Sequence, residues 1–161
     1  MIKQAEEKDI PTIEGILLDA VIWMKKNELQ NQWNEDSIKW SSLSKEYHIN
    51  DFYITYLNGV PAACMAITDS DQKYWPEIPK GNSLYIHKLT VKREFAGKGI
   101  SLELIDFAKK LSLKKDIDSL RLDCNFQRNK LRKIYENEGF IYSGKKKLEN
   151  HYDMALYVWH R

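Results

Sequence analysis

A basic turn with two glycines is the part of the sequence best suited to chemistry. It lies between the strand-like run 84–91 and a helical pattern that begins near Ile100, and it contains Gly97 and Gly99. The first N–H groups of a helix lack internal acceptors, and the helix dipole favours negative charge there. Glycines allow a phosphate to approach the backbone closely. Together with Lys92, Arg93 and Lys98, this spacing predicts a grip on the pyrophosphate of a coenzyme.

Two side chains near this turn are suited to proton transfer. His87 shares a strand face with Tyr85, and an imidazole with an unperturbed pKa of about 6.5 can act as a base near neutral pH. The alternative for His87 is a sheet histidine that only bonds a neighbour. Tyr135 follows Leu131 and Ile134 at helical spacing, and this spacing alone favours a core aromatic residue.

Composition predicts one domain, residues 1–161, with 43% hydrophobic and 30% charged residues. A net charge of +2 is too small to argue for nucleic acid or an anionic membrane as partner, so neither is expected. No signal peptide or membrane-spanning run is present, so a cytoplasmic location is expected. Cys64 and Cys124 lack paired spacing, so neither a metal site nor a disulfide framework is predicted.

Hydrophobic periodicity and turn residues predict an α/β fold. Asp9 and Pro11 are typical of a helix start, Asn58-Gly59 of a hairpin, and Gly139 of a helix end. The pattern predicts a mixed, partly antiparallel sheet of about seven strands flanked by about four helices. The expected strands are 1–5, 52–57, 62–68, 83–91, about 120–124, 140–145 and 152–159. The expected helices are 10–26, a short one from near Asp36, 100–115, and one ending at Gly139.

This order of elements resembles the GNAT superfamily of acyl-CoA-dependent N-acyltransferases. The family's turn motif is Gln/Arg-x-x-Gly-x-Gly/Ala, which the residues from Ala96 to Ser101 match with Gly99 as the central glycine. Ala96 and Ser101 depart from the motif at its two ends. The Tyr-Glu-Asn-Glu-Gly-Phe run from Tyr135 is a second match. The resemblance implies acetyl-CoA as cofactor and a sheet splayed between its fourth and fifth strands.

The resemblance also implies roles for individual residues. Arylalkylamine N-acetyltransferases carry His-x-His-x-Leu-x-Val, and the run from Tyr85 to Val91 retains the second histidine. His87 would then be the base and Tyr135 the acid that protonates the departing thiolate. Many relatives carry asparagine seven residues before this tyrosine, which leaves Arg128 or the adjacent Asn129 as a coenzyme contact. The implied coenzyme-binding residues are Leu89, Thr90, Val91, Lys92, Ala96, Gly97, Lys98, Gly99, Ile100, Ser101, Arg128 and Asn129.

The acceptor pocket is expected from aromatic and acidic residues, because aromatic rings and a carboxylate can hold an amine. The candidates are Trp23, Trp33, Trp75, Glu77 and Tyr85. A place in the core is the alternative for the tryptophans. Arg121 and Asp123, which alternate on one strand face, are expected to form an ion pair.

The function predicted from these residues and the resemblance is transfer of acetyl from acetyl-CoA to a small primary amine by direct attack. Direct attack needs no cysteine nucleophile, so Cys124 is assigned none. A protein or peptide amine is one alternative acceptor, and a coenzyme-binding module without catalysis is another. A monomer or a homodimer is expected.

Overall fold

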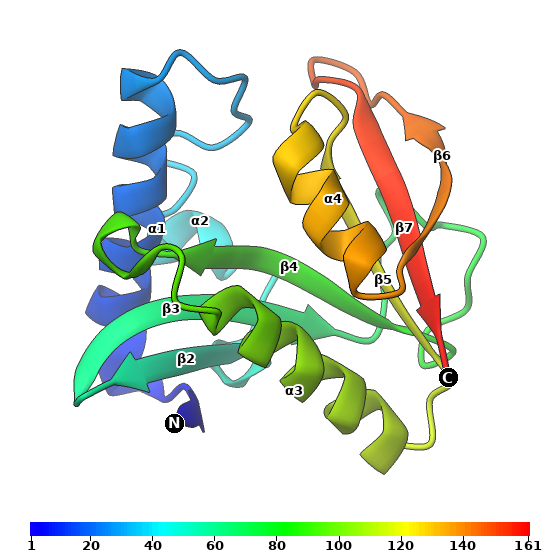
Figure 1. The fold of residues 1–161 in the computed structure, drawn as a ribbon, viewed down its shortest axis with the longest axis horizontal. Coiled ribbons are helices and arrows are strands. Elements are labelled where there is room, and N and C mark those ends of the chain that lie inside the picture. The colour runs from blue at the N-terminus through cyan, green and yellow to red at the C-terminus, as the bar shows by residue number, and fades with distance from the viewer. The chain divides into compact units, whose positions relative to one another are not determined.

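The computed structural model describes residues 1–161 and confirms the α/β prediction. Its mixed sheet has seven strands in the order β1-β2-β3-β4-β5-β7-β6 (Figure 1). The strands are β1 Ile2–Gln4, β2 Phe52–Leu57, β3 Val60–Thr68, β4 Leu84–Val91, β5 Ser119–Asn125, β6 Ile141–Lys146 and β7 Met154–His160. The helices are α1 Ile10–Lys26, α2 Trp40–Leu43, α3 Ile100–Lys114 and α4 Asn129–Asn137. Single 3-10 turns are η1 Glu7–Asp9, η2 Ile49–Asp51 and η3 Arg93–Phe95.

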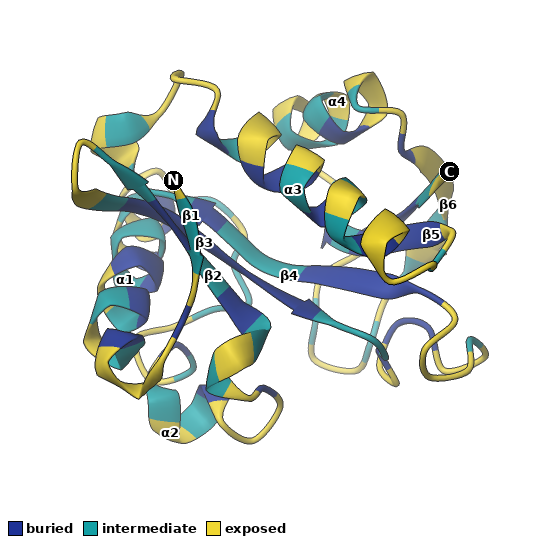
Figure 2. Cartoon of the chain, turned by 90° about the horizontal axis from the view of Figure 1, so that it is seen from below, coloured by how far each residue is buried: buried dark blue, intermediate teal, exposed yellow.

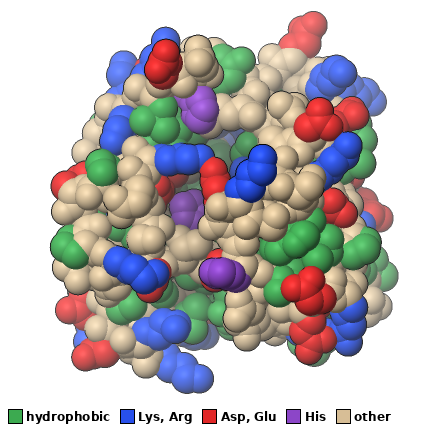
Figure 3. Space-filling view, turned by 180° about the vertical axis from the view of Figure 1, so that it is seen from behind, with side chains coloured by type: hydrophobic (Ala, Val, Ile, Leu, Met, Phe, Trp, Pro, Cys, Tyr) green, Lys and Arg blue, Asp and Glu red, His purple; other side chains and the backbone are tan.

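The chain divides into two compact units. The first unit comprises Met1–Ile67 and Lys88–Leu104, and the second comprises Thr68–His87 and Ile105–Arg161. Strand β4 and helix α3 therefore each contribute residues to both units. No helix combines the length and the apolar character needed to cross a membrane. On the face drawn in Figure 3, basic side chains are interspersed with acidic ones, in keeping with the small net charge.

In the first unit, α1 packs against the antiparallel strands β1, β2 and β3. The helix has one buried and one exposed side (Figure 2), because its apolar residues recur at helical spacing. The predicted hairpin is present, with positive φ values of 51° at Asn58 and 78° at Gly59. The buried core of this unit includes Ile13, Ile16, Leu17, Val21, Phe52, Ile54, Cys64 and Ala66.

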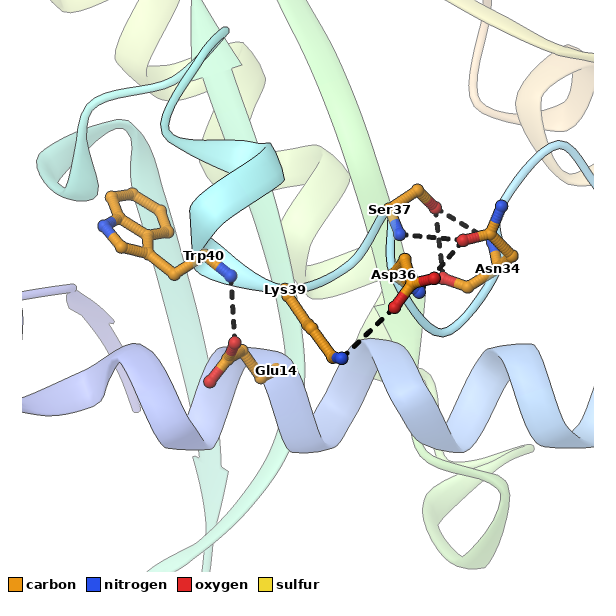
Figure 4. A network of polar contacts seen from close by, with 6 residues as sticks. All are labelled: Glu14, Asn34, Asp36, Ser37, Lys39 and Trp40. Atoms are coloured by element: carbon orange, nitrogen blue, oxygen red, sulfur yellow. Dashed lines mark hydrogen bonds and ion pairs between the residues drawn. The ribbon is translucent and has the colours of Figure 1, made fainter.

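Helix α2 begins at Trp40, whereas the sequence predicts a start near Asp36. The Asn34 side-chain oxygen accepts N–H bonds from Asp36 and Ser37, both at 2.9 Å, and holds that segment as a turn. The Glu14 carboxylate of α1 then accepts the Trp40 N–H at 2.9 Å (Figure 4). The acceptor that fixes the helix start thus comes from a distant residue, which local sequence does not reveal.

In the second unit, β4 and β5 are parallel, and β7 lies antiparallel between β5 and β6. Helix α4 ends as predicted at Gly139, which has a φ of 87°. The Phe140 N–H donates to the Tyr135 carbonyl at 3.0 Å and the Gly139 N–H donates to the Glu136 carbonyl at 3.1 Å. This is the Schellman pattern, and it fixes the backbone of Tyr135 directly.

The regular alternation predicted for 83–91 does not continue through the whole of β4. Lys88 has a φ of 56°, a left-handed conformation that interrupts the pleat immediately after His87. Beyond it, Thr90 is buried while Leu89 and Val91 are only partly buried. The registered pairs with β5 end at Tyr85 and Arg121, before this irregularity.

Candidate active site

The glycine turn of the first unit presents unpaired backbone donors. Gly97 and Gly99 have φ values of 78° and 76°, so the turn uses the left-handed conformation that glycine tolerates. No hydrogen bond runs from any N–H group of residues 97–101 to an acceptor of the chain, and the first such bond is from Glu103 to the Gly99 carbonyl at 3.1 Å. The sequence-based interpretation of the turn requires this arrangement of donors.

The turn is anchored on α1 and β3 by contacts within the first unit. The Arg93 N–H donates to the Asp19 carboxylate at 2.9 Å, and the Arg93 guanidinium lies 3.9 Å from the centre of the Trp23 ring. The Lys92 N–H donates to the Ala62 carbonyl at 2.9 Å. Arg93 and Trp23 therefore contribute a stacked pair that supports the turn.

The strand residues predicted to meet the coenzyme differ in exposure. The Thr90 hydroxyl donates to the Lys88 carbonyl at 3.1 Å, so this side chain is engaged locally. Leu89 and Val91 are partly buried. In the turn itself, Lys98 is exposed and Ser101 is half-buried.

His87, in the second unit, is held by a hydrogen bond that assigns its tautomer. The Thr68 hydroxyl lies 3.0 Å from His87 Nε2 and also 3.0 Å from the Ser70 carbonyl. Because a carbonyl can only accept, the hydroxyl hydrogen belongs to the bond with Ser70. The Thr68 oxygen then accepts from Nε2–H, which assigns the lone pair of neutral His87 to Nδ1. The Tyr85 ring stacks beside His87 with ring centres 6.4 Å apart.

Two carboxylates approach His87. One ligand-type atom from each of Asp71, His87 and Asp123 lies within 4.8 Å of the other two. Sequence reasoning did not assign Asp71 or Asp123 to the site. Tyr85 and Arg121 are the last registered pair of β4 and β5, and His87 and Asp123 each follow that pair by two residues on their own strand. This spacing is the signal that could have pointed to Asp123.

The expected ion pair between Arg121 and Asp123 does not form. The Arg121 guanidinium instead lies 4.7 Å from the centre of the Trp75 ring, and its Nε atom is buried without a partner. A cation can gain stabilisation over the face of an indole ring. Arg121 therefore has Trp75 as its partner rather than a residue of its own strand.

Tyr135 lies inside the second unit with its ring against Phe140 and Tyr157, at centroid distances of 5.8 Å and 6.2 Å. Burial is the main cause that raises the pKa of Tyr135, and Cys124 and Asp123 raise it further. The phenol therefore stays protonated across the physiological range and has a proton to donate. Arg128, at the N-terminal cap of α4, opposes this shift in the pKa of Tyr135.

The remaining predicted residues fall in different units. Trp23 and Trp33 belong to the first unit, where Trp33 packs against the core with Lys88 Nζ 4.5 Å from its ring centre. Glu77 is exposed in the second unit, and Asn129 is exposed in the first turn of α4. Trp75 and Tyr85 join the aromatic cluster of the second unit and are 4% and 1% exposed. Trp75 Nε1 and the Tyr85 hydroxyl are buried without hydrogen-bond partners.

The first unit contains a cavity of about 270 Å³. It is lined by Glu14, Gly15, Leu18, Glu35, Ile38 and Lys39. Figure 4 shows the polar network beside it, in which Lys39 pairs with Asp36 at 3.2 Å. None of the residues predicted for the site lines this cavity.

A profile described as the acetyltransferase (GNAT) domain matches residues 26–160, which is most of the chain. The chain belongs to the GNAT acetyltransferase family. This confirms the family inferred from the glycine turn and the run beginning at Tyr135. In the GNAT chain, the turn at 96–101 follows β4 and Tyr135 lies on α4, in the order that the resemblance implied.

Individual relatives agree with this assignment. The chain is 24% identical over 150 residues to the uncharacterized N-acetyltransferase YesJ of Bacillus subtilis (strain 168), covering 85% of this chain and 79% of YesJ. A GNAT-family acetyltransferase from Listeria monocytogenes 4b F2365 has the same fold, with a TM-score of 0.76 and 23% identity over 100% of this chain and 94% of that one. A chain of the NatC complex bound to Gag peptide and CoA gives a TM-score of 0.69 and 16% identity, covering 100% and 98%.

The two thiols of this GNAT chain are predicted to be unreactive in the folded state. Burial raises the pKa of Cys64 and of Cys124 to about 12, so at about pH 8 only about one thiol in 10⁴ is ionised. A thiol-specific chromogenic disulfide should therefore react with neither cysteine in the native protein and with both after denaturation. Stoichiometric labelling of Cys124 in the native protein, or an acetyl group trapped on it, would revive a covalent route.

Proposed function

We propose that this GNAT acetyltransferase takes its acetyl group from acetyl-CoA and transfers it to the primary amine of a small molecule. The observation that carries the proposal is the row of unpaired N–H groups at residues 97–101, at the start of α3. Backbone donors at a helix start suit a diphosphate. They remain available although Ala96 and Ser101 depart from the family motif. The NatC neighbour bound to CoA supports the same coenzyme.

In the proposed reaction the neutral amine nitrogen attacks the thioester carbonyl carbon. An alkyl ammonium has a pKa of about 10.4, so it must first lose a proton. His87 Nδ1, the lone-pair nitrogen in the assigned tautomer, accepts that proton directly or through water. The C–N bond forms, the attacking nitrogen loses its second proton to solvent, the C–S bond breaks, and Tyr135 protonates the leaving thiolate. The proton held by His87 then returns through solvent to the Tyr135 oxygen, which leaves an amide, CoA and one proton released to solvent.

The surroundings of His87 favour a cationic acceptor. Asp71 and Asp123 bring two carboxylates to the imidazole, and carboxylates stabilise a nearby ammonium. Trp75 and Tyr85, which were predicted to contact the acceptor, are buried in the same unit. Glu77, which is exposed, remains a candidate to attract the same charge.

A peptide amine is the second candidate acceptor, since the NatC neighbour is bound to a peptide as well as CoA. A coenzyme-binding module without catalysis is the third, motivated by the departures at Ala96, Ser101 and Arg128 from the family pattern. The three candidates differ in which compounds release CoA thiol from acetyl-CoA. Small amines should release it for the first candidate and peptides for the second, whereas neither should release it for a module without catalysis.

Acetyl transfer should depend on the two proton-transfer residues, Tyr135 and His87. With acetyl-CoA and a panel of small amines and peptides, thiol release should be fastest with a small primary amine. Tyr135→Phe should lower kcat by about 10²–10⁴-fold, because the donated proton is lost while the ring remains. His87→Gln should lower kcat/KM by a similar factor. The measurements are steady-state thiol release and the Kd for CoA, which should not change in either variant.

Matched controls for this prediction are Tyr152→Phe and His160→Gln, since both residues are exposed and neither belongs to the aromatic cluster. They should retain wild-type turnover. Binding of CoA with no thiol release from any acceptor would refute catalysis. Full activity of Tyr135→Phe would refute only the role given to the phenol.

Binding of the coenzyme should depend on the backbone conformation of Gly99. In Gly99→Ala, the alanine pays about 1–2 kcal/mol to hold the native φ of 76°. Without a ligand the turn should therefore relax to another conformation, and binding must restore the native one. The Kd for CoA should rise by about 5–30-fold in calorimetric titration. Gly81→Ala is the matched control, because Gly81 has a φ of 87° and equally open surroundings but lies in another loop. Equal weakening of CoA binding by both variants would contradict a specific role for the turn.

A further inference from the structure

We propose that Asp71, His87 and Asp123 form a binding site for a divalent transition-metal ion, of which Zn²⁺ is the best match. The three residues come from separate segments of the second unit: the loop after β3, strand β4 and strand β5. Their ligand-type atoms lie within 4.8 Å of one another. The inhibitory consequence described below rests on the proposed function, whereas metal binding itself does not.

The kinds of ligand decide which ions fit. One imidazole nitrogen and two carboxylate oxygens suit Zn²⁺ and its first-row neighbours, while Mg²⁺ prefers an all-oxygen shell with several waters. Three protein ligands leave a coordination position of a tetrahedral ion open for water. The proposed site therefore has the composition of an open metal site rather than a closed structural one.

The spacing requires the side chains to move closer together. Ligand atoms about 2.1 Å from a tetrahedral ion are about 3.4 Å apart, so a separation of up to 4.8 Å must close by up to about 1.4 Å. Rotation of the carboxylate side chains is the movement expected to supply this shift.

Two of the ligands are already oriented by neighbours. The Oδ1 atom of Asp71 accepts the N–H groups of Lys73 and Tyr74, each at 3.0 Å. The Nε2–H of His87 donates to the Thr68 hydroxyl, which leaves Nδ1 as the ligand nitrogen. A metal-binding histidine almost always donates its other N–H to such a partner.

Burial and charge add an independent reason for a cation. Asp71 is 8% exposed, and His87 and Asp123 are half-buried, so two carboxylates share a poorly solvated space. Arg121, two residues before Asp123 on β5, stacks on Trp75. The hydroxyl of Tyr85, a residue 1% exposed and stacked on His87, also lacks a partner. A bound ion with its water would stabilise these polar groups.

The ion would inhibit acetyl transfer. Zn²⁺ coordinated by Nδ1 occupies the lone pair that the proposed reaction needs for the proton of the amine. It also neutralises the carboxylates that favour an ammonium. Inhibition should therefore be competitive with the amine and reversed by a chelator, while CoA binding is unaffected.

The decisive experiment titrates Zn²⁺ into the chelator-treated full chain without acetyl-CoA or amine, using a competing chromophoric chelator. One equivalent should bind, and His87→Gln and Asp123→Asn should each weaken binding by about 100-fold or more, since each removes a ligand. Asp69→Asn and His151→Gln are the matched controls: Asp69 pairs with Lys80 and His151 lies beside Tyr74, so both should bind as wild type does.

A second readout avoids dependence on variant folding. Co²⁺ added to the wild-type chain should give visible ligand-field absorption that Zn²⁺ abolishes and that excess Mg²⁺ leaves unchanged. Absence of Zn²⁺ binding, or undiminished binding by His87→Gln, would overturn the metal site whatever the enzymatic activity. Zn²⁺ binding with no acetyl transfer to any amine would instead leave the metal site standing and refute the proposed function.

Discussion

The positive φ angles at Gly97 and Gly99 are the constraint on which the proposed chemistry of this acetyltransferase depends. They turn the chain from η3 into α3 while leaving the N–H groups of residues 97–101 without acceptors. Unpaired donors cost little while they are exposed to water. The stacked Arg93 and Trp23 pair, with the bond from the Arg93 N–H to Asp19, holds the turn so that its donors need not be ordered when a ligand arrives.

A second constraint governs the side chains of the other unit. The Thr68 hydroxyl can donate to only one acceptor, and its bond to Ser70 leaves it as acceptor for His87 Nε2–H. One threonine thereby sets the tautomer of His87. The Schellman bonds at Gly139 fix Tyr135 in a comparable way, because the tyrosine's own carbonyl accepts one of them.

Local signals in the sequence were enough to predict most of the fold. The Asn58-Gly59 hairpin, the Gly139 helix end and the period of α1 each depend on residues close together in the chain, and the structure contains all three. The late start of α2 could not be predicted in this way, because Glu14 provides its acceptor from another helix. The irregularity at Lys88 also has no local signal, since lysine has no preference for a φ of 56°.

The difference between local and distant determinants also explains which parts of the candidate site could be predicted from the sequence. A phosphate grip built from main-chain donors requires only glycines and a helix start, so it can be inferred from spacing even where Ala96 and Ser101 depart from the motif. Proton transfer and metal binding depend on side chains brought together by strand register and loop packing. Asp123 was expected to pair with Arg121, but Trp75 provides Arg121 with a stacking partner, and Asp123 lies with His87 and Asp71 instead. In this GNAT chain, the proposed coenzyme binding therefore rests on backbone geometry, and the proposed proton transfer from the acceptor amine rests on the charges gathered around one imidazole.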